Sequence, residues 1–396
     1  MTVKTVNNDK IKTFESAEYN MRYDKQTGVF IRWGKTLDDN PEMCTLGPEI
    51  LDIEISAGGG CIGKCPFCYK ANGGDYPTQN MRLATFMGIL SKFNTNILTQ
   101  VAFGIMNIST NPAFFSMMEH AKYRGIVPNY TTHGLDMTPE YAKKSAELCG
   151  VVAVSVIDRE KTFDAVAMLH DAGLGQVNIH YMLSEETYAG AFSLMHEIAN
   201  DERAKGLHAL VFLQYKAKGR GIGEYTSIQD VDKYRKLLER ASRLNIPIGF
   251  DSCSAPMYLK SLEGIPGGET LAKFVEPCES GLFSAYINHR GEFFPCSFME
   301  GRAGWKYGID TIKAGRFTQA AWNNPRTDAW RRRLLTVKGG TCTSCAYNSS
   351  CRVCPEYPEL KCLGAKAVDN VKESAVKTRI KEYSVIEVAQ PPGRLK

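Results

Sequence analysis

The sequence predicts an α/β protein with a cysteine-rich C-terminal part, and three observations support this prediction. Short apolar runs alternate regularly with helical patterns between residues 50 and 250 of the 396-residue chain. These runs are apolar almost throughout, as in strands that are covered on both faces. The chain has 13 cysteines, and most of them are clustered, within residues 61–68 and 342–362.

Composition and charge exclude several classes of protein. Hydrophobic residues make up 43% and charged residues 23%, which excludes wholesale disorder. The net charge of +5 is nearly balanced for this length, so we expect neither a nucleic-acid nor a membrane partner. The first residues lack the apolar region of a secretory signal, and no run approaches the ~18 apolar residues of a membrane span. We therefore expect a cytoplasmic protein, in which clustered cysteines indicate metal or redox chemistry.

The first 49 residues are expected to form a hairpin and a loop, with strands at 20–23 and 29–33. Six strand–helix units should follow, within a domain of residues 50–250. The expected strands are 50–56, 98–105, 125–132, 151–157, 176–183 and 209–215, and the expected helices lie near 80–93, 112–124, 139–148, 161–172, 186–200 and 228–243. Such a series implies parallel strands with right-handed crossovers and chemistry at their C-terminal ends. Periodicity leaves a partial barrel and an open doubly wound sheet as alternatives.

Several helix starts carry capping signals. Asn111 and Thr138 each precede a proline, which favours the first position of a helix. Ser227 with Asp230 resembles a capping box. After residue 250 the alternation stops, and a hairpin is expected at 283–287 and 292–294. We expect residues 251–364 to form a cysteine-rich domain and residues 365–396 a tail that is helical over 365–383.

The first cysteine cluster follows the first strand directly, with the spacing Cys61-x3-Cys65-x2-Cys68. Structural zinc sites and most iron–sulfur clusters take four protein ligands, whereas this compact loop supplies three. A 4Fe-4S cluster held by three thiolates keeps one iron open for another ligand. The spacing, together with Phe67 before the third cysteine, resembles the radical S-adenosylmethionine superfamily. A zinc loop that takes a distant fourth ligand is the alternative.

The resemblance implies a partial (β/α)6 barrel of the TIM type and binding of S-adenosylmethionine at the open iron. In that family, one electron from the reduced cluster cleaves the cofactor to a 5′-deoxyadenosyl radical, which abstracts hydrogen from the substrate. The electron comes from a donor such as flavodoxin or ferredoxin.

Matching the family's motifs to this chain gives four candidate cofactor-binding residues: Phe67, Gly104, Ser155 and Arg220. Gly104 matches one residue of the family's Gly-Gly-Glu turn, and the glutamate is absent. Ser155 is otherwise a small residue in a packed barrel, and Arg220 a residue of a surface loop. His133 ends the third strand as either a site residue or a turn residue.

The second cysteine array resembles the SPASM extension of the same superfamily, which carries auxiliary 4Fe-4S clusters. Cys351 and Cys354 are separated by two residues where the family has three. The resemblance assigns the outer cluster to Cys342, Cys345, Cys351 and Cys362. It assigns the inner cluster to Cys278, Cys296 and Cys354 together with a fourth ligand from upstream, for which Cys253 is the candidate. A pair of zinc ribbons is the alternative. Cys44 and Cys149 fit no pattern and are expected to be buried.

Enzymes with this combination mostly modify peptides or proteins by net oxidation, so we expect a peptide or protein substrate. Formation of formylglycine, as in anaerobic sulfatase maturation, and radical chemistry on a small molecule are alternatives. A non-enzymatic electron carrier or zinc scaffold is disfavoured, because it needs no open iron. The sequence identifies no catalytic acid or base.

Overall fold

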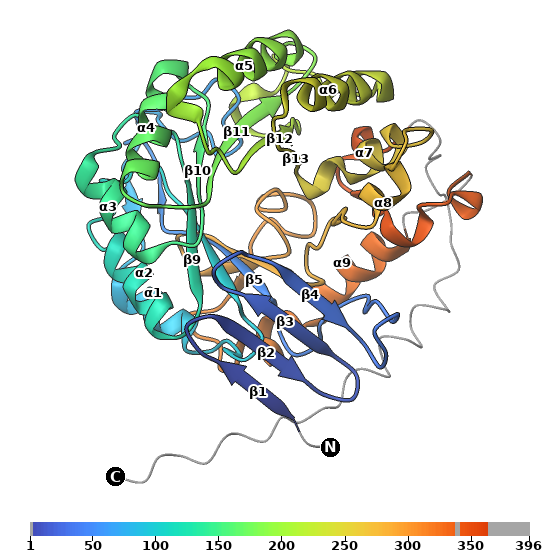
Figure 1. Ribbon diagram of the computed structural model, residues 1–396. Coiled ribbons are helices and arrows are strands. Elements are labelled where there is room, and N and C mark those ends of the chain that lie inside the picture. Colours follow the sequence, from blue (N-terminus) through green and yellow to red (C-terminus); the bar gives the residue numbers. More distant parts are fainter. Residues whose placement is uncertain (1–2, 337–340, 363–396) are drawn as a thin grey trace.

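The computed structural model describes residues 3–336 and 341–362, so the tail helix expected at 365–383 lies outside the described residues. The central element is a ten-stranded sheet with the order β13-β12-β11-β10-β9-β8-β5-β14-β15-β16 (Figure 1). Seven of its strands follow one another as parallel neighbours: β5 (Ile50–Glu54), β8 (Gln100–Gly104), β9 (Val127–Thr132), β10 (Val152–Ser155), β11 (Val177–Leu183), β12 (Ala209–Gln214) and β13 (Ile248–Phe250).

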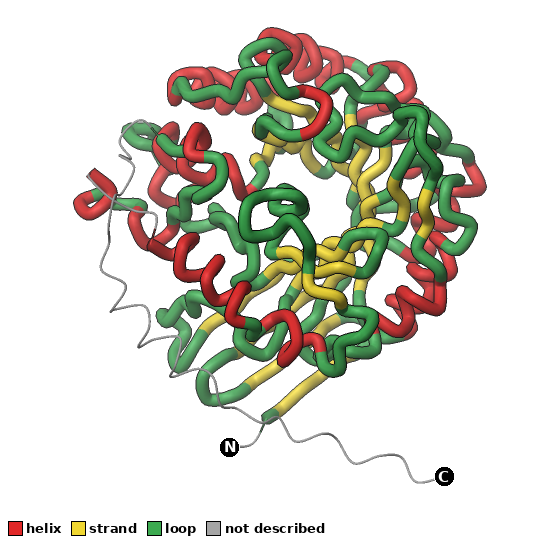
Figure 2. The backbone as a smooth tube through the Cα atoms, turned by 180° about the vertical axis from the view of Figure 1, so that it is seen from behind, coloured by secondary structure: helices red, strands yellow, loops and turns green. Residues whose placement is uncertain are grey.

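The strand order decides between the two architectures that periodicity left open. From β5 to β13 the order never reverses, so successive crossovers turn in one direction, whereas a doubly wound sheet needs a reversal. The helices accordingly lie on the outside of the curved sheet (Figure 2). The two end strands do not pair with each other, so the barrel is open. The predicted partial barrel is confirmed.

Each predicted barrel helix is present, with ends shifted by a few residues. The helices are α1 (Leu83–Leu90), α2 (Phe114–Tyr123), α3 (Pro139–Leu148), α4 (Arg159–Asp171), α5 (Tyr188–Asn200) and α6 (Val231–Leu244). Thr138 caps α3 as predicted, by accepting from the N–H of Tyr141. The capping box at Ser227 is wrong. Asp230 itself caps α6, while the Ser227 hydroxyl donates to the carbonyl of Tyr215 at 2.7 Å.

The hairpin predicted near residue 290 is confirmed as β14 (Ser284–Ile287) and β15 (Glu292–Phe294), with β16 (Ile309–Asp310) beside it. Unexpectedly, β14 also pairs in parallel with β5, so this C-terminal segment extends the barrel sheet past its first strand. The rest of the C-terminal part contains α7 (Ala255–Ser261), α8 (Gly268–Ala272) and α9 (Pro325–Thr336). A two-stranded ribbon, β6 (Ser56–Ala57) with β7 (Gln79–Asn80), brackets the cysteine loop.

The N-terminal segment is a four-stranded antiparallel sheet rather than a single hairpin. Its strands are β1 (Lys4–Asn7), β2 (Ile11–Glu15), β3 (Asn20–Asp24) and β4 (Phe30–Trp33), the last two being the predicted pair. Arg32 docks this sheet by ion pairs with Glu49 at 2.8 Å and Glu279 at 2.6 Å. Its guanidinium also lies 3.8 Å from the ring centre of Phe283. In the described chain, we find no helix with the length and apolar character needed to span a bilayer.

Candidate cofactor and substrate site

The three cysteines of the first cluster lie together at the C-terminal end of the barrel strands. Cys61 is buried, Cys65 and Cys68 are half-buried, and all three line one cavity of about 530 Å³. Burial, and after it the charges of the neighbouring Cys68 and Cys61, raise the pKa of Cys65 to about 11. The three sulfurs are therefore close enough to interact, and they face the interior of the barrel.

The loop keeps these cysteines in place through an unusual backbone. Lys64 and Ala71, on either side of the second and third cysteines, have φ angles of +42° and +55°. Side chains other than glycine rarely adopt this left-handed region, because their Cβ approaches the carbonyl oxygen. Between them, the N–H of Cys68 donates to the carbonyl of Cys65 at 3.1 Å. Such local strain is often found at functional sites, where the surrounding structure enforces it.

Asn107, after β8, fastens the loop to the barrel. Its side-chain oxygen accepts from the N–H of Ile62 at 3.0 Å, and its amide donates to the carbonyl of Gly60 at 2.8 Å. His133 lies 3.0 Å from the same Asn107 oxygen through Nε2, while its Nδ1 accepts from the N–H of Leu135. These contacts require a neutral imidazole with its proton on Nε2, and burial lowers the pKa of His133 accordingly. The contacts of His133 fit both interpretations, because it accepts a hydrogen bond within its own turn and also lines the cavity.

The cavity brings together three of the four predicted cofactor-binding residues. Phe67, Gly104 and Ser155 all line it. A Cβ on Gly104 would lie 3.3 Å from the Cα of Glu54, so the glycine permits close packing of β8 against β5. Ser155 ends β10 and is half-buried.

Arg220, the fourth candidate, does not line this cavity, so the structure favours the alternative of a loop residue. Its N–H donates to the carbonyl of Cys68 at 3.0 Å, and its guanidinium donates to the carbonyl of Asn72. Arg220 therefore braces the back of the cysteine loop. The motif placed it correctly along the chain, but the direction of its side chain depends on how the loop folds over it.

The far wall of the cavity carries an ion pair that sequence reasoning missed. The ammonium of Lys216 lies 2.8 Å from the carboxylate of Asp251 and 4.6 Å from the ring centre of Phe298. Burial acts to lower the pKa of Lys216, but the charges of Asp251 and Cys253 outweigh it and hold the pKa above its ordinary value. Lys216 follows β12, and Asp251 follows β13. Functional residues of barrels lie at the C-terminal ends of the strands, so this position along the chain was the signal that could have identified the pair.

Four cysteines form a group directly behind this ion pair: Cys253, Cys278, Cys296 and Cys354. Burial raises the pKa of Cys253 to about 12, and the charges of Cys354 and Cys296 contribute to the increase. The pKa of Cys278 is raised by burial and then by Cys253, Cys354 and Cys296. The structure thus places Cys253, the upstream candidate, beside the three cysteines that the resemblance assigns to the inner cluster.

A second group, Cys342, Cys345, Cys351 and Cys362, lines one small pocket with Pro256 and Leu259 of α7. These are the four residues that the resemblance assigns to the outer cluster. The remaining two cysteines stay apart from both groups. Cys44 is buried in the core that the N-terminal sheet shares with the C-terminal part, and Cys149 packs against the barrel core.

The donor sets fit iron–sulfur clusters by their chemistry: one group of three thiols beside an open cavity, and two groups of four. Over residues 3–336 and 341–362, no group of three or more His, Cys, Asp or Glu side chains is arranged to hold a single metal ion.

Fold and site together define a class, namely a partial barrel with a three-thiol loop at its mouth and a cysteine-rich extension. Several solved structures match most of the chain. Streptococcus suis SuiB bound to its precursor peptide SuiA has 12% sequence identity and a TM-score of 0.66, over 88% of this chain and 94% of SuiB. SuiB bound to S-adenosylmethionine gives the same identity and TM-score over 90% of this chain and 98% of SuiB.

A second neighbour, anSMEcpe with bound S-adenosylmethionine (AdoMet), has 16% identity and a TM-score of 0.56, over 85% of this chain and 93% of that one. No family model and no curated protein matches the sequence. At these identities the likeness concerns the fold. The fold that the resemblance to the radical S-adenosylmethionine superfamily predicts is therefore confirmed.

Proposed function

We propose that this protein is a radical S-adenosylmethionine enzyme that oxidatively modifies a peptide or protein. The observation that carries the proposal is the convergence of the three loop cysteines with Phe67, Gly104 and Ser155 on one cavity. The neighbouring structures contain S-adenosylmethionine, and SuiB and anSMEcpe were both crystallised with peptides. Residues 50–250 would bind the cofactor, and residues 251–364 would hold two auxiliary clusters.

In this proposal Cys61, Cys65 and Cys68 hold a 4Fe-4S cluster with one open iron. When bound, that group supplies one electron to S-adenosylmethionine and so generates a 5′-deoxyadenosyl radical. The protein's own residues orient and shield the reactants. Asn107 and His133 fix the loop, Gly104 and Ser155 line the cofactor side of the cavity, and the stacked rings of Tyr69 and Phe298 form part of its wall.

The cofactor assignment is tested by anaerobic reconstitution. We expect three clusters, about 12 iron atoms per chain, from one group of three thiols and two groups of four. Changing Cys61, Cys65 and Cys68 together to Ala should remove one cluster and abolish the formation of 5′-deoxyadenosine. Cys149→Ala is the matched control, because this cysteine lies apart from all three groups. Undiminished 5′-deoxyadenosine from the triple variant would refute the assignment.

The oxidative part of the proposal rests on the auxiliary groups. A substrate that loses hydrogen to the radical must pass one further electron on, and the inner cysteines lie behind the Lys216–Asp251 wall of the cavity. Changing Cys345 and Cys351 to Ala should remove the outer cluster and the modified peptide, while S-adenosylmethionine is still cleaved. Mass spectrometry of the peptide, which detects a loss of two hydrogens or a larger excision, measures this. Full product from the double variant would show that the outer cluster is neither an electron path nor part of the substrate site.

A further inference from the structure

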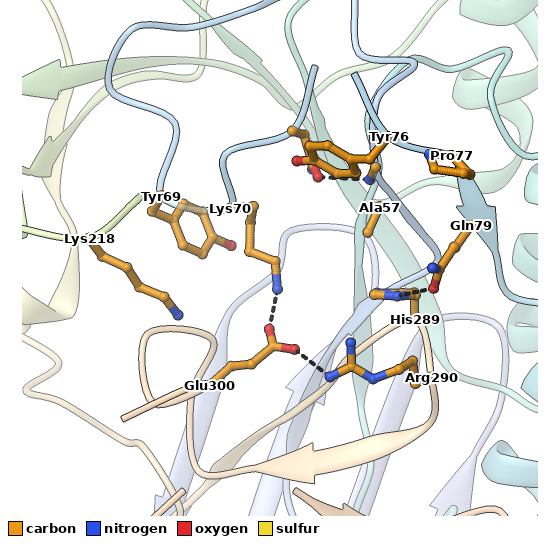
Figure 3. Close-up of a pocket in the computed structure, with 12 residues that line it drawn as sticks. Ala57, Tyr69, Lys70, Tyr76, Pro77, Gln79, Lys218, His289, Arg290 and Glu300 are labelled. Carbon is orange, nitrogen blue, oxygen red and sulfur yellow. Dashed lines mark hydrogen bonds and ion pairs between the residues drawn. The ribbon is translucent and has the colours of Figure 1, made fainter. Parts of the chain in front are cut away.

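A second cavity, of about 330 Å³, lies beside the barrel cavity and has no role in the chemistry described so far. Its walls come from the segment after the three cysteines and from the β14–β15 turn with the loop that follows (Figure 3). Tyr69, Lys70 and Asn72 line both cavities, so the two spaces share a wall. We call this second cavity the recess. A ligand held in it would lie next to the cysteine loop.

Most charged groups of the recess already have partners of opposite charge. Lys70 pairs with Glu300 and lies 3.2 Å from Glu54. Arg290 pairs with Glu292 at 2.7 Å and with Glu300 at 3.3 Å. Figure 3 shows the pair with Glu300. His289 lies 3.1 Å from the carboxylate of Glu54. These groups form a closed network that fixes the shape of the recess.

Lys218 is different. Over the described part of the chain, no carboxylate lies within ion-pair distance of its ammonium, which instead donates to the carbonyl of Ser297 at 2.7 Å. An ammonium has three N–H donors, so two remain for a ligand. The side chain reaches the recess beside Tyr69, and its nitrogen lies 5.8 Å from the ring centres of both Tyr69 and Phe298. Burial, and then the charge of Lys70, lower the pKa of Lys218 to about 8, although the more distant charge of Glu300 acts to raise it.

We infer that the recess binds a carboxylate of the peptide substrate, with Lys218 as its ionic partner. The inference rests on the proposed function and adds a specificity-determining residue to it. A single uncompensated ammonium matches a single negative charge. A phosphate carries nearly two charges and favours arginine forks, but the only arginine of the recess is already paired and Glu300 would repel a dianion.

The location explains what such an anchor would do. Because Tyr69 and Lys70 line both spaces, a peptide held by Lys218 can continue past them into the barrel cavity. The stacked rings of Tyr69 and Phe298, with centroids 4.5 Å apart, offer a rigid surface beside the path. The anchor would therefore select which residue of the peptide lies near the cysteine loop.

The experiment selects phage-displayed random peptides of twelve residues on the reconstituted full-length protein, in the presence of S-adenosylmethionine. We compare wild type with Lys218→Met, which keeps the apolar stem, and with Lys218→Arg, which keeps the charge. Lys205→Met is the control, because this exposed lysine precedes β12 whereas Lys218 follows the opposite end of that strand. Thermal midpoints verify that each variant is folded. Synthetic versions of selected peptides, ending in a carboxylate or a carboxamide, separate a side-chain carboxylate from the C-terminal one.

We expect wild type and Lys218→Arg to select peptides with Asp or Glu at one position, or to prefer a free C-terminal carboxylate. Lys218→Met should bind the same peptides about tenfold more weakly or worse, measured by fluorescence anisotropy. The inference is overturned if the selected peptides show no preference for a carboxylate, or if they bind Lys218→Met as tightly as wild type. Either result would leave the proposed function intact. A loss of S-adenosylmethionine affinity alone in Lys218→Met would place the carboxylate on the cofactor and also overturn it. If no peptide is selected while S-adenosylmethionine is cleaved, the peptide function itself fails.

Discussion

Gly219 offers a sharp test of how the cysteine loop is held. This residue begins a short 3-10 turn after β12 and has a φ angle of +72°. A Cβ at this position would lie 2.3 Å from the carbonyl oxygen of Cys68 and 2.6 Å from the carbonyl carbon of Tyr69. Both are backbone atoms of the cysteine loop, so they cannot move aside as a flexible side chain would. We predict that Gly219→Ala displaces the loop.

The structure gives the size of the effect and its control. An alanine in the left-handed region costs about 1–2 kcal/mol. The same cost applies at Gly223, whose φ is +85° and whose Cβ would meet no atom within 4 Å. Only at Gly219 must the cysteine loop also move away from the new Cβ. This movement breaks the 3.0 Å hydrogen bond from the Arg220 N–H to the Cys68 carbonyl, which costs about 1 kcal/mol more, and it also costs packing energy. Gly219→Ala should therefore lose about 2–4 kcal/mol of unfolding free energy, and Gly223→Ala about 1–2 kcal/mol.

The assays are urea unfolding, iron content after anaerobic reconstitution, and formation of 5′-deoxyadenosine. We expect both variants to lose stability, but only Gly219→Ala to lose iron from the first cluster and cleavage of S-adenosylmethionine. Equal losses in the two variants would refute the claim that close packing of Gly219 positions the loop. A Gly219→Ala variant with full iron content and full cleavage would refute it equally.

Three further predictions concern other groups. Asn107→Ala removes the hydrogen bonds that hold the cysteine loop, so it should lower the free energy of unfolding by about 2–3 kcal/mol and reduce the iron content of the first cluster. Asn80→Ala, the control, loses one exposed hydrogen bond at 2.8 Å and should be nearly neutral in both assays. Burial lowers the pKa of Lys12 from 10.5 to about 7 in the folded chain, so the unfolded state binds more protons between these values. Stability should therefore rise from pH 7.5 to 9, by up to about 1.4 kcal/mol per unit, and Lys12→Met should abolish this slope in urea unfolding. Cys253→Ser should lower the iron content of the inner cluster, and iron equal to wild type would show that Cys253 is not a ligand.

The barrel could be predicted from sequence because each of its units is local. An apolar run such as 151–157 needs only its own residues to indicate a buried strand, and Thr138 caps α3 through a contact three residues away. The order of the units along the chain then sets the order of the strands, since right-handed crossovers place successive parallel strands side by side. The spacing of Cys61, Cys65 and Cys68 is likewise a local signal, because all three lie on one loop.

What the sequence could not provide depends on contacts between distant segments. β1 is exposed at every residue, so its strand has no apolar alternation to reveal it. β14 resembles any hairpin strand, and its parallel pairing with β5 exists only because a chain segment more than two hundred residues later returns to the barrel. The direction of the Arg220 side chain depends on how such segments meet, and so does the lack of a carboxylate within ion-pair distance of Lys218 in the described chain; a motif records neither.

In the proposed function, the spatial order of the three cysteine groups would let an electron pass away from the substrate. The barrel cavity, with the loop cysteines at its mouth, is bounded by Lys216 and Asp251, and Asp251 caps the short turn that contains Cys253 of the inner group. That turn leads directly into α7, whose Pro256 and Leu259 line the pocket of the outer group. One short helix thus connects the two auxiliary groups, and one ion pair separates the inner group from the cavity. Because α7 lines the outer pocket and follows directly on the turn that contains Cys253, displacing it should impair the proposed inner and outer clusters together, whereas the proposed loop cluster, whose loop is held by Asn107 and Gly219, should persist.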